Sequence, residues 1–220
     1  MEKRNTLLAG ASGLVGSALL DKLISDDRYD KIVLISRNPD ISYTSEKIIS
    51  QLIDFDDLIH LKTEIRIDDV YCALGTTIKT AGSQDAFRKV DFDYVVNLAK
   101  WSQNNGIQRF MVVSAMGSKA SSAIFYNKIK GEMEDAVKLV QIPETHVFRP
   151  SLLLGNRKEK RTGEKIAQMV MTAIGFIFKG PLLNFKGIKA SDVASSMIDT
   201  AFETSPGFHV HLSGDMQPKR

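Results

Sequence analysis

The stretch G-A-S-G-L-V-G occupies residues 10–16, directly after the short apolar run T-L-L-A at residues 6–9. From Leu14 onward, apolar residues recur with the period of a helix as far as residues 26–27. The order strand, glycine turn and helix is typical of a phosphate-binding unit, because the N–H groups at the start of such a helix face an anion.

The three glycines of this turn suit three different tasks. We expect Gly10 to allow the tight turn off the strand, Gly13 to let the backbone approach a pyrophosphate, and Gly16 to let the helix pack closely on the sheet. A glycine-rich turn is a weak signal alone, but its place after an N-terminal strand strengthens it. The cofactor-binding residues expected here are Gly10, Ser12, Gly13, Leu14, Val15 and Gly16.

The second apolar run, K-I-V-L-I-S at residues 31–36, ends at Arg37. In dinucleotide-binding folds an acid at this point binds the ribose 2′-hydroxyl of NAD, whereas an arginine accommodates the 2′-phosphate of NADP. No acid directly follows the strand, so Arg37 favours NADP, with NAD as the open alternative. The competing interpretation of Arg37 is an ordinary solvated loop cation.

Residues 114–130 read S-A-M-G-S-K-A-S-S-A-I-F-Y-N-K-I-K, which places Tyr126 and Lys130 four residues apart on one helix face. A phenol can protonate the oxyanion formed as hydride reaches a carbonyl, but its ordinary pKa of about 10 is high for work at neutral pH. A neighbouring ammonium lowers that pKa. Without the glycine turn, the pair would be interpreted as an ordinary surface tyrosine and lysine.

The Y-x-x-x-K spacing after the apolar run of residues 110–114 resembles the catalytic segment of short-chain dehydrogenases, and G-x-x-G-x-x-G resembles the turn of their extended and atypical branches. Three further motifs are L-G-T-T at residues 74–77, Y-x-x-x-K-G-E at residues 126–132 and F-R-P-S-L-L-L-G-N-R at residues 148–157. Together they are most similar to the atypical members related to the Tat-interacting oxidoreductase proteins. The resemblance runs from Thr6 to about Phe202.

This resemblance implies roles that the residues alone do not establish. Lys130 would also bind the nicotinamide ribose, and a serine at the end of the preceding strand would polarise the substrate carbonyl. Ser114 is the candidate for that serine, and the neighbouring alternatives are Ser118, Ser121 and Ser122. The backbone that passes beneath the cofactor would be that of Ala73, Leu74, Gly75 and Thr76.

Alternating strand and helix patterns predict an α/β fold, a doubly wound parallel sheet of the Rossmann type covered on both faces. The predicted strands lie near residues 6–9, 31–36, 48–52, 70–74, 109–114, 145–149 and 207–212. The predicted helices lie near residues 14–25, 83–104, 122–140, 163–175 and 191–203. We expect one domain, residues 1–220, in which residues 150–190 form a small C-terminal region on the substrate side.

Composition limits the classes of partner. With 43% hydrophobic and 25% charged residues in 220, the chain can bury a full core, and a net charge of +3 is too small to predict a nucleic-acid partner. Cys72 is the only cysteine, which excludes an internal disulfide, and a buried strand thiol is expected there. No N-terminal signal is recognised, so a cytoplasmic location is expected.

Two segments and the histidines complete the expectations. The charged segment of residues 157–161 is interpreted as a solvated loop, with an acidic substrate or partner as the alternative. The apolar run of residues 169–178 is too short to span a membrane, which leaves a buried helix, a contact in a homodimer or a lid over the substrate. His60, His146, His209 and His211 are taken as too scattered for a metal site, so no metal is expected.

Two hypotheses of function follow from these patterns. The first is an NAD(P)H-dependent oxidoreductase that reduces a small-molecule carbonyl substrate, with Tyr126 as general acid, Lys130 as its tuner and Ser114 as polariser. The second is a regulatory protein that senses NADPH and acts through a protein partner. An intact Tyr126 and Lys130 favours the enzyme, because a pure sensor needs no proton donor at the nicotinamide.

Overall fold

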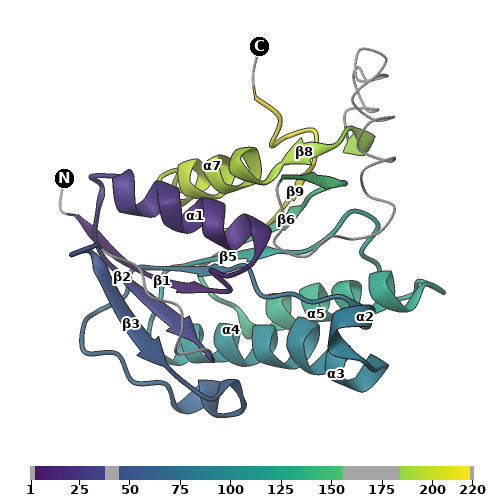
Figure 1. The fold of residues 1–220 in the computed structure, drawn as a ribbon, viewed down its shortest axis with the longest axis horizontal. Helices are drawn as coiled ribbons and strands as arrows, with labels where there is room; N and C mark the ends of the chain where they lie inside the picture. The colour runs from purple at the N-terminus through teal and green to yellow at the C-terminus, as the bar shows by residue number, and fades with distance from the viewer. Residues whose placement is uncertain (1–2, 38–44, 156–183, 219–220) are drawn as a thin grey trace.

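The computed structural model describes residues 3–37, 45–155 and 184–218, and a seven-stranded parallel sheet lies at its centre (Figure 1). The strand order is β3-β2-β1-β4-β5-β6-β9, with a separate pair of short strands, β7 and β8. The strands are β1 (Arg4–Ala9), β2 (Tyr29–Ser36), β3 (Ile48–Leu52), β4 (Asp69–Cys72), β5 (Arg109–Val113), β6 (Glu144–Arg149), β7 (Leu153–Leu154), β8 (Ile188–Lys189) and β9 (Gly207–Leu212).

Helices cover both faces of the sheet, as the continuous apolar strands require. On one face α1 (Leu14–Ser25) packs beside α7 (Ala190–Ala201), and on the other lie α4 (Tyr94–Asn104) and α5 (Phe125–Val140) (Figure 1). Two short helices precede α4, namely α2 (Ile78–Ala81) and α3 (Gln84–Arg88). Each layer buries its own hydrophobic cluster against the sheet.

The order of the strands reverses between β1 and β4, which predicts a crevice at the carboxyl ends of these two central strands. The chain builds β1, β2 and β3 outward in one direction and then returns to add β4 on the other side of β1. Ala9 pairs with Cys72 at the carboxyl ends of β1 and β4, so the loops beginning at Gly10 and Ala73 leave the sheet side by side. In open α/β sheets, ligands bind at this switch point.

The predicted fold is confirmed, and each of the predicted strands is present. The predicted helix of residues 83–104 is interrupted, because α3 and α4 are joined by a π-helical turn, Lys89–Asp93, that brings Asp91 into the interior. The strands β7 and β8 and a 3₁₀ turn, Phe55–His60, were not predicted. The predicted helix of residues 163–175, the charged segment 157–161 and the apolar run 169–178 lie outside the described residues.

His146 lies beside His209 and His211, which the sequence patterns did not predict. Strand β9 pairs with β6, which brings Nδ1 of His146 to 3.0 Å from Nε2 of His211 and stacks the His146 ring on that of His209. Burial lowers the pKa of His146 to about 4 and also lowers that of His211. Within the described ranges, no group of three or more ligating side chains is arranged to hold a metal ion.

No helix in the described part of the chain is both long and apolar enough to cross a lipid bilayer.

Candidate active site

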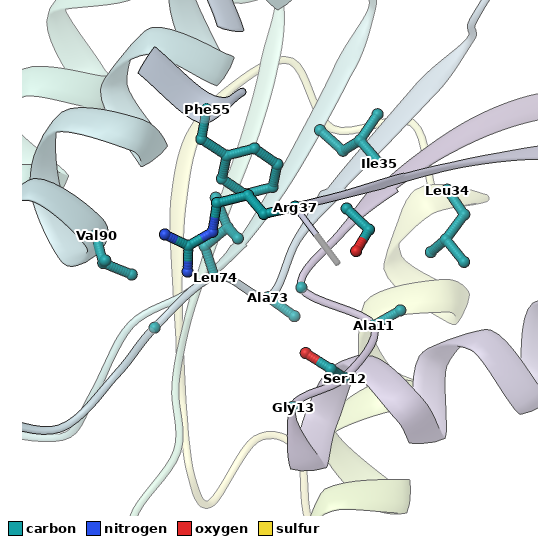
Figure 2. A pocket seen from close by; sticks show the side chains of 13 residues that line it. Ala11, Ser12, Gly13, Leu34, Ile35, Arg37, Phe55, Ala73, Leu74 and Val90 are labelled. Atoms are coloured by element: carbon teal, nitrogen blue, oxygen red, sulfur yellow. The ribbon is translucent and has the colours of Figure 1, made fainter. Parts of the chain in front are cut away.

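A cavity of about 430 Å³ opens at the carboxyl ends of β1, β2 and β4. Figure 2 shows Ser12 and Gly13 at the start of α1 on one side of this cavity, and the Arg37 side chain beside the Phe55 ring on the other. Its lining residues are Gly10, Ala11, Ser12, Gly13, Leu34, Ile35, Ser36, Arg37, Phe55, Ala73, Leu74, Gly75 and Val90.

The three glycines of the first turn differ in what surrounds them. A Cβ on Gly10, whose φ is +90°, would lie 2.5 Å from the carbonyl oxygen of Ala73, and one on Gly16 would lie 2.0 Å from that of Gly10. Both positions are closed by backbone. A Cβ on Gly13 would meet nothing nearer than the Gly10 carbonyl oxygen at 3.3 Å. Glycine is therefore required at positions 10 and 16 for the backbone to pack, whereas the absence of a side chain at Gly13 leaves space in the cavity that it lines.

Ten of the twelve predicted cofactor residues divide into two groups, and the other two, Thr76 and Lys130, contact Asp91. Those that line the cavity are Gly10, Ser12, Gly13, Arg37, Ala73, Leu74 and Gly75. Leu14, Val15 and Gly16 instead form the first turn of α1, whose N–H groups have no earlier turn to accept them. The side chain of Val15 is buried in the core, and that of Leu14 packs against Gly155. These three can contribute backbone N–H groups.

Arg37 lies in the open mouth of the cavity. Its guanidinium carbon is 5.5 Å from the centre of the Phe55 ring and 5.8 Å from that of Tyr94, which is within the range of a cation–π contact. The sequence patterns did not identify Phe55 as part of the site. The local signal for Phe55 is its position shortly after the carboxyl end of β3, because the loops that follow parallel strands form the binding crevice.

Lys130 approaches the cavity from α5, behind the loop that follows β4. Its Nζ lies 2.8 Å from Oδ1 of Asp91, and the two side chains are 4% and 1% exposed. The other oxygen of Asp91 accepts the N–H of Thr76 at 2.8 Å. A Cβ on Gly75 would lie 3.4 Å from the Asp91 carboxylate and 3.8 Å from the Lys130 ammonium, so this pair backs the cavity wall.

Tyr126 stands one turn before Lys130 in the first turn of α5 and is half-buried. Its ring packs against that of Phe87 at a centroid distance of 5.6 Å. The pKa of Lys130 reflects a balance: burial lowers it, and the charges of Asp91 and then Tyr126 raise it to a net value above the ordinary one. Lys130 is therefore an ammonium close to the Tyr126 phenol.

Ser114 is held in a different set of contacts. Its hydroxyl donates to Oε1 of Glu134 and lies 3.0 Å from the hydroxyl of Ser118. Arg149 holds the same carboxylate through two nitrogens, with Nε 3.0 Å from Oε1. Ser114 is 5% exposed, and its single proton points at Glu134. In this geometry the hydroxyl ties the end of β5 to α5.

Cys72 ends β4, directly before the cavity-lining loop that begins at Ala73, but its thiol is unreactive. It is fully buried, and burial raises its pKa to about 12, with the neighbouring Leu74 N–H and Lys130 lowering it only in part. A thiol with so high a pKa forms almost no thiolate at neutral pH. The expectation of a buried strand thiol agrees with this position.

Comparison with known proteins identifies the family. Residues 6–129, from the first strand into α5, match the model of the NAD dependent epimerase/dehydratase family. The chain belongs to this family. It is 33% identical to Protein HTATIP2 of Rattus norvegicus, across 76% of this chain and 70% of that protein. It is 37% identical to the mitochondrial Protein FMP52 of Candida albicans, across 90% and 87%. The resemblance to Tat-interacting proteins is thereby confirmed.

Solved structures support the fold at greater distance. A UDP-N-acetylglucosamine 4-epimerase from Methanobrevibacter ruminantium, in complex with UDP-N-acetylmuramic acid, aligns with a TM-score of 0.71 at 16% identity, covering 96% of this chain and 77% of that one. The enzyme WbmH of Bordetella bronchiseptica, in complex with NAD⁺, aligns with a TM-score of 0.71 at 15% identity, covering 96% and 76%. At such identity the likeness establishes the Rossmann-like fold.

The expected cytoplasmic location is contradicted by the relatives. Several fungal proteins similar to this chain are named mitochondrial, among them those of Candida albicans, Meyerozyma guilliermondii and Debaryomyces hansenii. The expectation rested on failing to recognise a signal at the start of the chain, and such an absence does not determine the compartment.

We predict that Gly13→Val abolishes binding of a reduced nicotinamide cofactor while the protein still folds. The branched side chain would occupy space in the cavity, because the nearest atom to a Cβ at position 13 is the Gly10 carbonyl oxygen at 3.3 Å. The matched substitution Gly16→Val should instead prevent folding, because its Cβ would lie 2.0 Å from backbone. Thermal unfolding with and without NADPH or NADH measures both. A Gly13→Val protein that is still stabilised by cofactor would show that this turn does not hold the phosphates.

Proposed function

We propose that the protein is an NAD(P)H-dependent reductase of a small carbonyl compound, with Tyr126 as its general acid. One observation carries this proposal: the ammonium of Lys130, one turn from Tyr126 on α5, lies 3.8 Å from the position a Cβ would take on the cavity-lining Gly75. The ammonium that would stabilise the Tyr126 phenolate thus lies directly behind one wall of the cavity. Membership of an NAD-dependent family supports the cofactor class.

The residues present fit a dinucleotide. The first-turn N–H groups of α1 and the glycine turn would hold the pyrophosphate, and Leu34 and Phe55 offer apolar surface for the adenine side. Lys130 would contact the nicotinamide ribose. When bound, the reduced cofactor supplies the hydride that the carbonyl carbon accepts.

The protein itself supplies the proton and the electrostatics. Tyr126 gives its phenolic proton to the carbonyl oxygen as negative charge develops there. The nearby Lys130 ammonium stabilises the phenolate that remains. Ser114 was predicted to polarise the substrate carbonyl, but its hydroxyl donates a hydrogen bond to Glu134. We therefore propose Tyr126 and Lys130 as the catalytic pair. The role of Ser114 stays a prediction.

We further propose that NADPH is preferred over NADH, because Arg37 directly follows β2 at the cavity mouth, where a ribose 2′-phosphate would lie. The names of the fungal relatives support mitochondria as the compartment of this activity.

Arg37→Asp should narrow or reverse the preference for NADPH, which we expect to be at least about tenfold in the unmodified protein, given the strength of a charge-assisted hydrogen bond. Fluorescence titration with both reduced cofactors gives the two dissociation constants. The matched control is Arg66→Asp, which changes the net charge equally at a side chain that is 85% exposed and absent from the cavity lining. Equal affinities for NADPH and NADH in the unmodified protein would refute the assignment.

Tyr126→Phe should keep the affinity for NADPH and lower carbonyl turnover about 10²–10⁴-fold, because only the phenolic proton is lost. Cofactor oxidation is followed at about 340 nm, the absorbance of reduced nicotinamide, across a panel of aldehydes and ketones. Lys130→Ala should weaken cofactor binding as well as turnover. If Tyr126→Phe reduces an accepted carbonyl at the wild-type rate, the catalytic assignment fails and the alternative of a cofactor sensor becomes the better account.

A further inference from the structure

We propose that Asp91 is a positioning residue that holds the Lys130 ammonium against the cofactor cavity and fixes it to the loop after β4. The inference rests on the proposed function, because it concerns how Lys130 is kept ready to meet the nicotinamide ribose and Tyr126. The sequence patterns gave Asp91 no role, and the predicted uninterrupted helix of residues 83–104 would not have turned it inward.

The carboxylate joins two parts of the site. One oxygen lies 2.8 Å from Nζ of Lys130, and the other accepts the N–H of Thr76 at 2.8 Å. Gly75 packs against this carboxylate, since a Cβ added to it would lie 3.4 Å from Oδ1 of Asp91. The π-helical turn that contains Asp91 supplies the inward displacement, and such turns occur frequently at functional sites. A movement of Asp91 would therefore move both the lysine and the cavity wall.

The energetics favour an electrostatic role over mere packing. A lysine side chain that is 4% exposed has lost most of its hydration, which is strongly unfavourable unless an opposite charge compensates for it. Asp91 is the carboxylate in contact, while Tyr126 on α5 and Cys72 on β4 are the other titratable groups that act on Lys130. Burial lowers the pKa of Lys130, and Asp91 is the main influence that raises it above its ordinary value.

The substitution Asp91→Asn separates charge from shape. The amide oxygen can still accept the Thr76 N–H, but Lys130 loses its counter-charge, so its pKa in the folded variant should fall below the unfolded value of about 10.4. A lysine whose folded pKa is lowered destabilises the fold fully at pH values below that folded pKa, and the destabilisation fades as pH rises from the folded toward the unfolded pKa. The stability deficit of the variant should therefore shrink as pH rises from 7 to 9.5.

Urea unfolding of the cofactor-free protein tests this directly. We expect the difference in unfolding midpoint between wild type and Asp91→Asn to decrease from pH 7 to 9.5, and to become independent of pH when Lys130→Met is added. The matched control is Asp56→Asn, which breaks a Lys89 pair of the same 2.8 Å length whose side chains are 49% and 52% exposed, and it should show no such trend. A pH-independent deficit in Asp91→Asn would overturn the proposal.

If Asp91→Asn does not fold, the wild-type protein still decides the question. Nitrogen-15 NMR of the lysine side chains, with Lys130 assigned by its loss in Lys130→Met, should show Nζ protonated up to about pH 10. Titration of Lys130 below pH 9 in the wild type would show that Asp91 does not hold its charge.

The cofactor provides the readout specific to positioning. We expect the NADPH dissociation constant of the wild type to stay constant between pH 7 and 9.5, and that of Asp91→Asn to rise about tenfold as Lys130 loses its proton. Equal and constant affinities in both proteins would overturn the role of Asp91 at the cofactor, as would a wild type that binds no cofactor. A wild type that binds NADPH as described yet reduces no carbonyl would refute the proposed function and leave the role of Asp91 supported.

Discussion

The contact between the turn after β1 and the loop after β4 is the constraint on which the site depends. With φ of +90° at Gly10 and backbone atoms of Ala73 where its side chain would be, the two loops leave the sheet as one unit. Gly16 then packs its helix onto Gly10, which fixes the start of α1. The cavity is the space that these close backbone contacts leave open.

The same loop connects the cavity to the opposite layer of helices. From Ala73 the chain passes Gly75 to Thr76, whose N–H binds Asp91, and Asp91 binds Lys130 on α5. One turn further along α5, the buried Glu134 is bound by Arg149 at the end of β6. One buried ion pair, with Asp91, and one partly buried ion pair, with Arg149, therefore hold this helix at the carboxyl ends of the strands. Tyr126, at the start of the same helix, is thereby held in place, as its proposed role of general acid requires.

Local signals were sufficient for the sheet and for the glycine turn. The central strands contain apolar runs, and the spacing of Gly10, Gly13 and Gly16 specifies a turn that depends only on neighbouring residues. The position of Asp91 was not predictable, because its inward turn depends on a π-helical insertion and on a lysine from another helix. The engagement of Ser114 by Glu134 was hidden for the same reason. The gathering of His146 with His211 depends on the pairing of β6 with β9, which no local pattern specifies.

The structure of the protein in complex with NADPH tests the central claim most directly. The account predicts the pyrophosphate against the N–H groups that follow Gly10, the 2′-phosphate at Arg37, and the nicotinamide ribose at Lys130 with Asp91 still paired to it. The nicotinamide ring should face the hydroxyl of Tyr126. A dinucleotide bound outside this cavity, or one whose nicotinamide end points away from Tyr126 and Lys130, would contradict the account.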